Sequence, residues 1–335
     1  MATALNGGEI PVNALTIEKR LADIWREEGE GDEHAVTRAA LWNVVAHTWN
    51  ASQHAFAAEV LGRASASVPQ RTIVIRADPH ASAELSSFIS TNCHLMGGGR
   101  QVCSEEVAIV AAGERVHHVP PLVASLLLPD MPVAVWWLGD LPNEEHDYVQ
   151  ALLDPADRLI VDSSQFDSAA DFALVSRIAE TTITAPADLN WARIEEWRAA
   201  TAALFDPLAM RPRLGAIRSV RINSGGRAEL GPLSEAVLYV SWLRAQTGRE
   251  IAFDFASEGD EAGINTVEVR FDDGSTQTLR GDRERGVVLA SDGVTRGQTR
   301  DLEALIVRLL KRPEADRVYI KALRVAHDVA ARAAA

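Results

Sequence analysis

The stretch VPPLVASLLLPDMPVAVWWL, residues 119–138, is the most apolar part of the chain and decides how its first half folds. Its length raises the question of a membrane span. Pro129, Asp130 and Pro132 interrupt it, and these residues would break a helix and place a charge in the hydrocarbon. The stretch therefore predicts a short helix, a turn and a buried strand over 133–138, and we expect no membrane partner.

Segments on both sides of this stretch predict strands that alternate with helices. Upstream, the consecutive β-branched residues Ile73, Val74 and Ile75 are typical of a buried strand. A hairpin follows, because two apolar segments flank three glycines at 97–99. Strands are predicted over 71–76, 133–138 and 158–161, the hairpin over 85–96 and 102–111, and helices over 116–128, 144–153 and 169–179. This alternation favours a largely parallel sheet covered by helices.

The two ends of the chain have a different character. Apolar spacing over the first 70 residues predicts helices around 15–25, 41–49 and 56–61. After Pro212 the pattern changes to strands around one central helix, with a hairpin turn at 272–274 and two closing helices. The predicted fold class is α/β over residues 1–210, with N-terminal helices and a largely parallel sheet with a hairpin. An α+β domain with an antiparallel sheet is predicted over residues 211–335.

Composition and charge exclude several classes of function. The chain has 335 residues, 47% of them apolar, and a formal net charge of −14 without a local basic patch. A phosphate backbone would repel such a chain, so we expect no nucleic-acid partner. The first residues lack the basic start and apolar run of a secretory signal. Two cysteines are too few for a disulfide framework, and a cytoplasmic location is expected.

The motifs of common catalytic sites are missing from the sequence. The glycines at 97–99 precede Arg100, without the lysine and hydroxyl residue of a phosphate-binding loop. Cysteines ten residues apart and adjacent histidines do not match the spacing of zinc ligands. Ser163 and Ser164 follow a strand and Asp162, where they could accept a phosphate or cap a helix. We therefore predict no catalytic residue, metal or cofactor, and a chain that is not an enzyme.

Cys93 and Cys103 offer one inference about redox chemistry. If the hairpin closes around Gly98, residues whose numbers sum to 196 face each other, and these two cysteines satisfy that condition. Opposed strand residues lie close enough for a disulfide after modest adjustment. Two reduced thiols that pack as small core residues remain the alternative.

Several short segments, in the same order, resemble the glucose-6-phosphate dehydrogenase assembly protein family OpcA. The most recognisable is LPDMPVAVWW at 128–137. The others are RTIVI at 71–75, VCSEE at 102–106, ADRLIVDS at 156–163, DLNWAR at 188–193, WR at 197–198, LFD at 204–206 and the helix at 237–243. The resemblance implies a non-catalytic protein of the oxidative pentose phosphate pathway that binds glucose-6-phosphate dehydrogenase, promotes its active oligomer and makes it responsive to metabolite or redox state. Cys93 and Cys103 would be the redox candidates.

The docking surface is expected among loops beyond the carboxyl ends of the predicted parallel strands. Our partner-binding or ligand candidates are Asp130, Trp137, Asp140, Asp162, Ser163, Ser164, Asn190 and Arg193. Each could instead cap a helix or pack in the core. An enzyme or sensor that binds a sugar phosphate through Ser163, Ser164 and Arg193, and a passive subunit of the dehydrogenase, remain alternative functions.

Overall fold

The protein is represented by a computed structural model that describes residues 12–31, 36–96, 100–141, 147–225, 230–257, 263–282, 286–289, 295–297 and 300–333. The glycines predicted to form the hairpin loop, 97–99, lie outside these ranges. The chain forms two compact units, Met1–Val161 with Leu302–Pro313 and Asp162–Asp301 with Glu314–Ala335. This division differs from the predicted one near residue 210. None of the described helices is both long and apolar enough to cross a bilayer.

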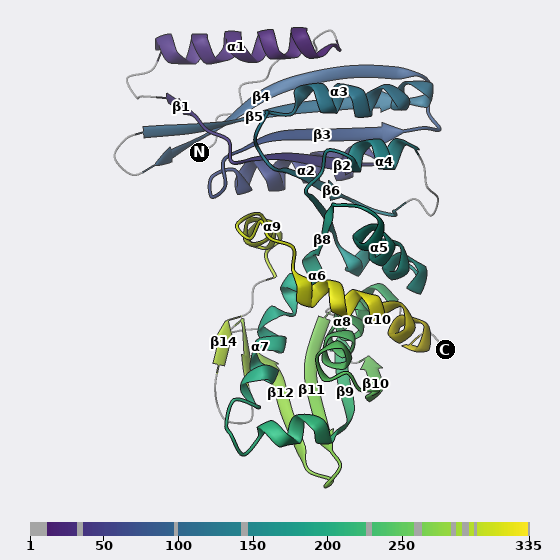
Figure 1. The fold of residues 1–335 in the computed structure, drawn as a ribbon. Coiled ribbons are helices and arrows are strands. Elements are labelled where there is room, and N and C mark those ends of the chain that lie inside the picture. Colours follow the sequence, from purple (N-terminus) through teal and green to yellow (C-terminus); the bar gives the residue numbers. More distant parts are fainter. Residues whose placement is uncertain are drawn as a thin grey trace. The chain divides into compact units, whose positions relative to one another are not determined.

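The first unit contains a sheet with strand order β1-β5-β3-β2-β6-β7 (Figure 1). Every neighbouring pair in this order is parallel, and β4 pairs with β5 in the predicted antiparallel hairpin. The strands are β1 (Val36–Arg38), β2 (Trp42–Thr48), β3 (Gln70–Asp78), β4 (Glu84–Met96), β5 (Arg100–Ala112), β6 (Val133–Trp137) and β7 (Arg158–Val161). The predicted α/β class with a largely parallel sheet is confirmed.

One predicted helix of this unit is wrong. Residues 41–49 contain β2, which pairs with β3 on one side and β6 on the other. All seven β2 residues are buried, including Asn43 and His47. A short apolar segment buried on both faces has no helical or alternating period, so periodicity alone could not separate the two structures.

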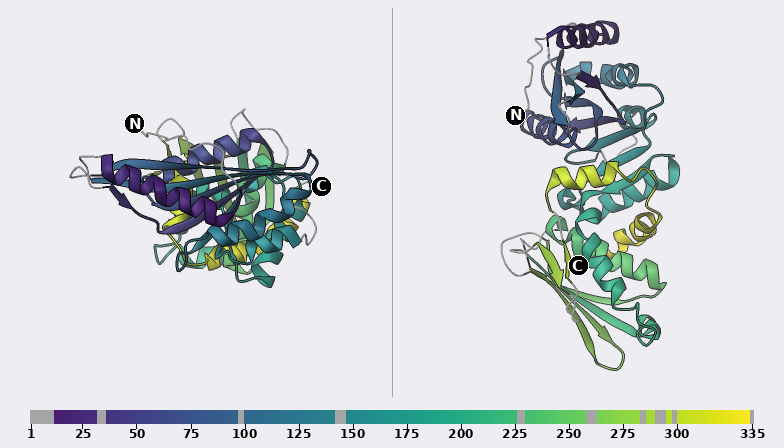
Figure 2. Two further views of the ribbon diagram at one scale, coloured as in Figure 1. Left: turned by 90° about the horizontal axis from the view of Figure 1, so that it is seen from above. Right: turned by 90° about the vertical axis from the view of Figure 1, so that its left-hand side faces the viewer.

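Helices cover both faces of this sheet. α2 packs on β2 and β3, and α9 packs on α2 although about 240 residues separate them in sequence. α2 and α3 lie on opposite faces (Figure 2, right). The helices are α1 (Ala14–Gly31), α2 (Ala51–Ala64), the 3₁₀ helix η1 (Gly113–His118), α3 (Val119–Leu126), α4 (Asp147–Leu153) and α9 (Leu302–Leu310). The helix, turn and strand predicted within 119–138 are confirmed.

A buried ion pair joins α1 to the sheet. Arg71 on β3 has a side chain that is 1% exposed, and its Nε and Nη2 lie 2.8 and 2.6 Å from Glu105 Oε2 on β5. Its Nη1 donates to Glu18 of α1 at 2.5 Å and to the Leu126 carbonyl at 2.7 Å. The Trp25 indole of α1 donates to Glu105 Oε1 at 2.5 Å. Burial alone would lower the pKa of Arg71, but Glu18 and Glu105 outweigh it and raise the pKa.

The second unit contains a six-stranded sheet with order β10-β9-β11-β12-β13-β14. Its pairs are antiparallel except that β10 runs parallel to β9, so the prediction of an antiparallel sheet is corrected to a mixed one. The parallel pair arises because helix α8 connects β9 to β10 as a crossover. The strands are β9 (Ile217–Gly225), β10 (Ala252–Ser257), β11 (Gly263–Phe271), β12 (Thr276–Asp282), β13 (Val287–Leu289) and β14 (Thr295–Gly297).

Helices pack on one face of this sheet. α8 contacts β9 and β11, α7 contacts β12, and α10 packs against both α8 and α5. Gly281 on β12 favours this close packing, because a Cβ there would lie 3.1 Å from the Trp197 ring of α7, a tight contact. The remaining elements are α5 (Ala169–Thr181), β8 (Ala185–Asp188), α6 (Leu189–Arg193), α7 (Glu195–Ala203), α8 (Leu230–Thr247), α10 (Arg317–Ala333), η2 (Ser163–Gln165) and η3 (Arg211–Ala216).

The ion pair of Arg71 leads to a stability prediction. Glu105→Gln keeps the side-chain shape but leaves part of the charge of Arg71 uncompensated, so we expect the free energy of unfolding to fall by about 3–5 kcal/mol. Glu59→Gln is the matched control, since Glu59 pairs with Arg63 on the surface and is 68% exposed. That change should cost less than about 1 kcal/mol. Equal urea midpoints for the two variants would contradict the role assigned to Glu105.

Candidate functional site

The carboxyl ends of β2 and β6 carry a cluster of aromatic side chains. His47 and Trp137 are directly opposite each other in the parallel ladder, and their rings stack with centroids 3.9 Å apart. Trp137 is 2% exposed, so this partner-binding candidate packs in the core, which is the alternative role expected from the sequence. The indoles of Trp137 and Trp49 donate to the Asp140 carbonyl at 3.0 and 3.3 Å. The Asp140 backbone is thereby fixed while its side chain is exposed.

Two buried polar groups border this aromatic cluster. Neither ring nitrogen of His47 has a hydrogen-bond partner within the described part of the chain, and the same holds for the Tyr148 hydroxyl. The two rings lie 5.7 Å apart. Burial lowers the pKa of His47 to about 3 and raises the pKa of Tyr148. His47 is therefore neutral near pH 7 and does not act as a cation in this cluster.

Asp130 lies at the opposite end of β6 from Asp140. Because it precedes the strand, the structure does not bring it to the carboxyl edge where we expected the candidates to gather. Asp130 has φ of +63°, a left-handed conformation that aspartate tolerates better than most residues. The side chain of Asn43 holds this turn, donating to the Leu128 and Met131 carbonyls at 3.0 and 3.2 Å. Sequence reasoning missed Asn43, although a lone amide inside an apolar strand is itself a signal.

Five further candidates come together in the second unit. Arg193 of α6 makes two parallel hydrogen bonds to Asp162, at 2.7 and 2.8 Å, and donates to Asn190 Oδ1 at 2.5 Å. Asp162 also accepts from the Ser164 backbone and hydroxyl, at 3.1 and 2.7 Å. Hydrogen bonds from Arg193 and Ser164 outweigh burial and lower the pKa of Asp162. The cluster is a charge-assisted network whose members bind one another.

Asp188 connects this network to the core, although it is not one of the eight partner-binding candidates. Its Oδ1 accepts from the backbone N–H groups of Asn190 and Ser163, at 2.8 and 3.1 Å, and the first of these bonds caps α6. Its Oδ2 lies 3.4 Å from the Tyr319 hydroxyl. Burial, and then the negative charge of Asp162, raise the pKa of Asp188 to about 6. Asp162 directly follows β7 and Asp188 is the last residue of β8, and two carboxyl groups at neighbouring strand ends are the sequence signal for a raised pKa at one of them.

The cysteines predicted to face each other in the hairpin are paired in the structure. Cys93 and Cys103 are directly opposed in the β4–β5 ladder, as the predicted register requires, and they form a disulfide. Cys103 is fully buried and Cys93 is 9% exposed. Within the described ranges no three His, Cys, Asp or Glu side chains are grouped to hold a metal ion.

The raised pKa of Asp188 leads to a prediction about pH. Between about pH 4 and 6 the folded chain holds a proton that the unfolded chain has released, so this group stabilises the fold at low pH and loses that effect as pH rises through 6. Between pH values below about 4 and above about 6, the contribution of Asp188 to the free energy of unfolding changes by roughly 3 kcal/mol. Asp188→Asn keeps the acceptor oxygen but cannot titrate. We expect the native chain to gain stability relative to this variant between pH 7 and 5, measured by urea unfolding. A pH-independent difference would contradict the assignment.

Two family models match the chain in succession. The glucose-6-phosphate dehydrogenase subunit N-terminal domain of the OpcA family matches residues 62–177. The corresponding C-terminal domain matches residues 184–323. The first range contains six of the eight partner-binding candidates and the second contains the other two. Together the two ranges cover most of the chain.

Two curated relatives are similar to part of the chain. The OxPP cycle protein OpcA of Synechocystis sp. is 28% identical over 54% of this chain, and that of Synechococcus elongatus is 30% identical over 59%. These matches cover 38% and 43% of the relatives, so the chain matches less than half the length of either.

Among solved structures, a scyllo-inositol dehydrogenase from Lactobacillus casei is 8% identical, with 88% of this chain and 98% of that chain covered and a TM-score of 0.42. The UDP-N-acetylglucosamine 3-dehydrogenase GnnA from Acidithiobacillus ferrooxidans is 12% identical, with 88% and 97% covered and a TM-score of 0.43. Likeness at this level carries no argument about activity. The two consecutive family models show that the chain belongs to the OpcA family of glucose-6-phosphate dehydrogenase assembly proteins.

Proposed function

We propose that the chain is a non-catalytic assembly factor and allosteric activator of glucose-6-phosphate dehydrogenase in the oxidative pentose phosphate pathway. The observation that carries this proposal is the pair of family models, both described as domains of a glucose-6-phosphate dehydrogenase subunit, which together extend from residue 62 to residue 323. An activator must bind the active oligomer more tightly than the inactive form, because only that difference shifts the equilibrium. Such a role needs an exposed, well-positioned surface.

The loop after β6 is the docking surface that we favour. Two indoles, from Trp49 and Trp137, hold the Asp140 carbonyl, while the Asp140 carboxylate is exposed and available to a partner. Trp49 is itself half-buried, so part of its ring could be covered in a complex. Asp130 and the network residues Asp162, Ser164 and Arg193 remain further candidates for partner contacts. Ser163 and Asn190 are buried and hold the network in place.

The same network bears on the alternative sugar-phosphate role. In the structure the Arg193 guanidinium already donates to Asp162 and Asn190, and Ser164 donates to Asp162. A phosphate would have to replace the Asp162 carboxylate in these bonds, at the cost of leaving a half-buried carboxylate without its cation. This geometry favours the partner role for the chain.

We expect the chain to form a complex with glucose-6-phosphate dehydrogenase from the same organism, and to lower its KM or raise its kcat. Asp140→Lys should weaken that complex by about tenfold or more, since it reverses a charge at the proposed interface. Because the Asp140 carbonyl and not its side chain accepts the two indoles, the fold should tolerate the change. Sedimentation and steady-state kinetics of the mixture measure both effects.

Asp154→Lys is the matched control, because Asp154 is also exposed but follows α4 and lies outside the loop after β6. It should bind as the native chain does. Equal weakening by both substitutions would reject the proposed surface but keep the partner role. The absence of any complex or kinetic change would reject the partner role, and glucose 6-phosphate would then be titrated against the chain alone.

We further propose that the disulfide between Cys93 and Cys103 makes the chain responsive to redox state. Activation of the dehydrogenase should differ between oxidised and reduced native chain, and the double variant Cys93→Ser, Cys103→Ser should show no difference. The variant should also lose about 2–3 kcal/mol of stability, because the disulfide closes a short loop in the unfolded chain. Equal activation by oxidised and reduced native chain would show that the disulfide is structural only.

A further inference from the structure

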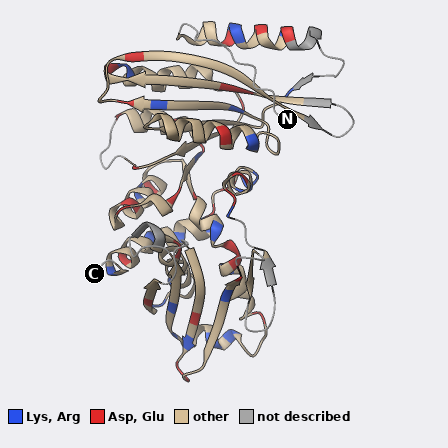
Figure 3. Cartoon of the chain, turned by 180° about the vertical axis from the view of Figure 1, so that it is seen from behind, with Lys and Arg blue, Asp and Glu red and all other residues tan. Residues whose placement is uncertain are grey.

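The six-stranded sheet of the second unit has one face that is polar. Its inward positions, including Val220, Val267 and Val269, are buried, whereas alternate positions carry exposed or half-buried polar side chains. Figure 3 shows basic and acidic residues interspersed along these strands. The chain has a net charge of −14 and therefore a negative overall electrostatic potential. The arginines on this face place positive charge locally against that potential.

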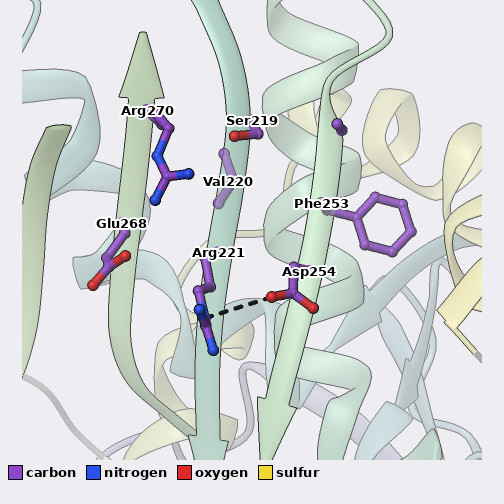
Figure 4. Close-up of a pocket in the computed structure, with 8 residues that line it drawn as sticks. Ser219, Val220, Arg221, Phe253, Asp254, Glu268 and Arg270 are labelled. Carbon is purple, nitrogen blue, oxygen red and sulfur yellow. Dashed lines mark ion pairs between the residues drawn. The ribbon is translucent and has the colours of Figure 1, made fainter. Parts of the chain in front are cut away.

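The strand register produces a depression on this polar face. Ala252, Ser219 and Arg270 form one cross-strand row, in which the first two side chains are small. The next row contains Asp254, Arg221 and Glu268, which are larger. The short side chains leave a hollow of about 220 Å³ beside the longer ones. Its lining comes from β9, β10 and β11 (Figure 4).

The two arginines at this hollow differ in their partners. Arg221 lies between two acidic residues, since it pairs with Asp254 at 3.5 Å and faces Glu268 across the ladder. Arg270 faces Ser219 and Thr276, and within the described residues it makes no ion pair. Figure 4 shows the Arg270 guanidinium over the gap between β11 and β9, while the Glu268 carboxylate points away from it. Arg270 therefore presents an uncompensated charge to the hollow.

We propose that this hollow binds the oxyanion group of a small metabolite, a phosphate monoester or a carboxylate. Arg270 would donate two hydrogen bonds to it, as guanidinium groups do to planar or tetrahedral oxyanions, and the Ser219 hydroxyl would donate a third. Asp254 and Glu268 border the hollow and would repel an extended polyanion. The small volume and the acidic rim together select a compact ligand with a single anionic group. This site is separate from the docking surface proposed above and does not depend on it.

Isothermal titration of the full chain with inorganic phosphate, and in parallel with acetate, tests the proposal at constant ionic strength. We expect binding in the millimolar range, with affinity falling about tenfold in Arg270→Gln because the main donor is lost. Arg280→Gln is the matched control, since Arg280 lies on the same polar face, opposite Thr266, and does not line the hollow. It should bind within about twofold of the native chain.

The possible outcomes distinguish a phosphate site from a carboxylate site, and they also include results that would reject the site. Tighter binding of phosphate than of acetate, lost only in Arg270→Gln, would assign the site to phosphate esters, and the reverse order would assign it to carboxylates. Equal affinity of the native chain and Arg270→Gln, an equal loss in Arg280→Gln, or no heat at millimolar ligand would each overturn the proposal. Since the assay contains no dehydrogenase, its result is independent of the partner role.

Discussion

Arg71 and Glu105 lie side by side on two neighbouring strands, and almost no solvent reaches either side chain. Around this pair gather the Glu18 carboxylate and Trp25 indole of α1 and the last carbonyl of α3. A buried guanidinium needs every one of its N–H groups paired, because an unpaired buried charge costs several kcal/mol. Its donors point in fixed directions, so the partners must occupy fixed positions. The position of α1 on the sheet, and of the α3 end that precedes the turn at Asp130, depends on this requirement.

The carboxyl edge of the first unit and the network of the second follow a common principle. Polar groups at both places are satisfied mainly by other groups of the chain, as for the Asp140 carbonyl, which accepts from two indoles, and Arg193, which donates to Asp162. Groups held in this way position the backbone and leave few donors for a substrate. Such construction suits a surface presented to another protein. The exceptions are His47 and Tyr148, which are buried and have no hydrogen-bond partner among the residues that the structure describes. Elsewhere in the second unit, Arg270 projects into a hollow on the polar sheet face.

Much of the fold could be predicted from local patterns. The β-branched run at 73–75, the pairing of Cys93 with Cys103, the helix cap at Asp188 and the turn at 272–274 all have signals within a few residues. The errors share a cause as well. The sequence predicts a helix at β2, because a fully buried strand lacks a period. It predicts an antiparallel sheet that includes β10, because the local sequence of a strand does not specify which strand it pairs with. Of the site candidates, five meet in one network, whereas Asp130 lies at the wrong end of its strand.

By itself the sequence determined the α/β class, the order of most elements, the hairpin register and the family, because these depend on composition, short-range spacing and ordered motifs. The tertiary structure decided which charges face each other. Arg71 is 34 residues from Glu105 and 53 residues from Glu18 in sequence. Asp188 is 131 residues from Tyr319. It also decided that α9 joins the first unit and that Arg270 has no acidic partner across its strand. Contacts between distant residues depend on the whole packing of the chain, and no local pattern contains them.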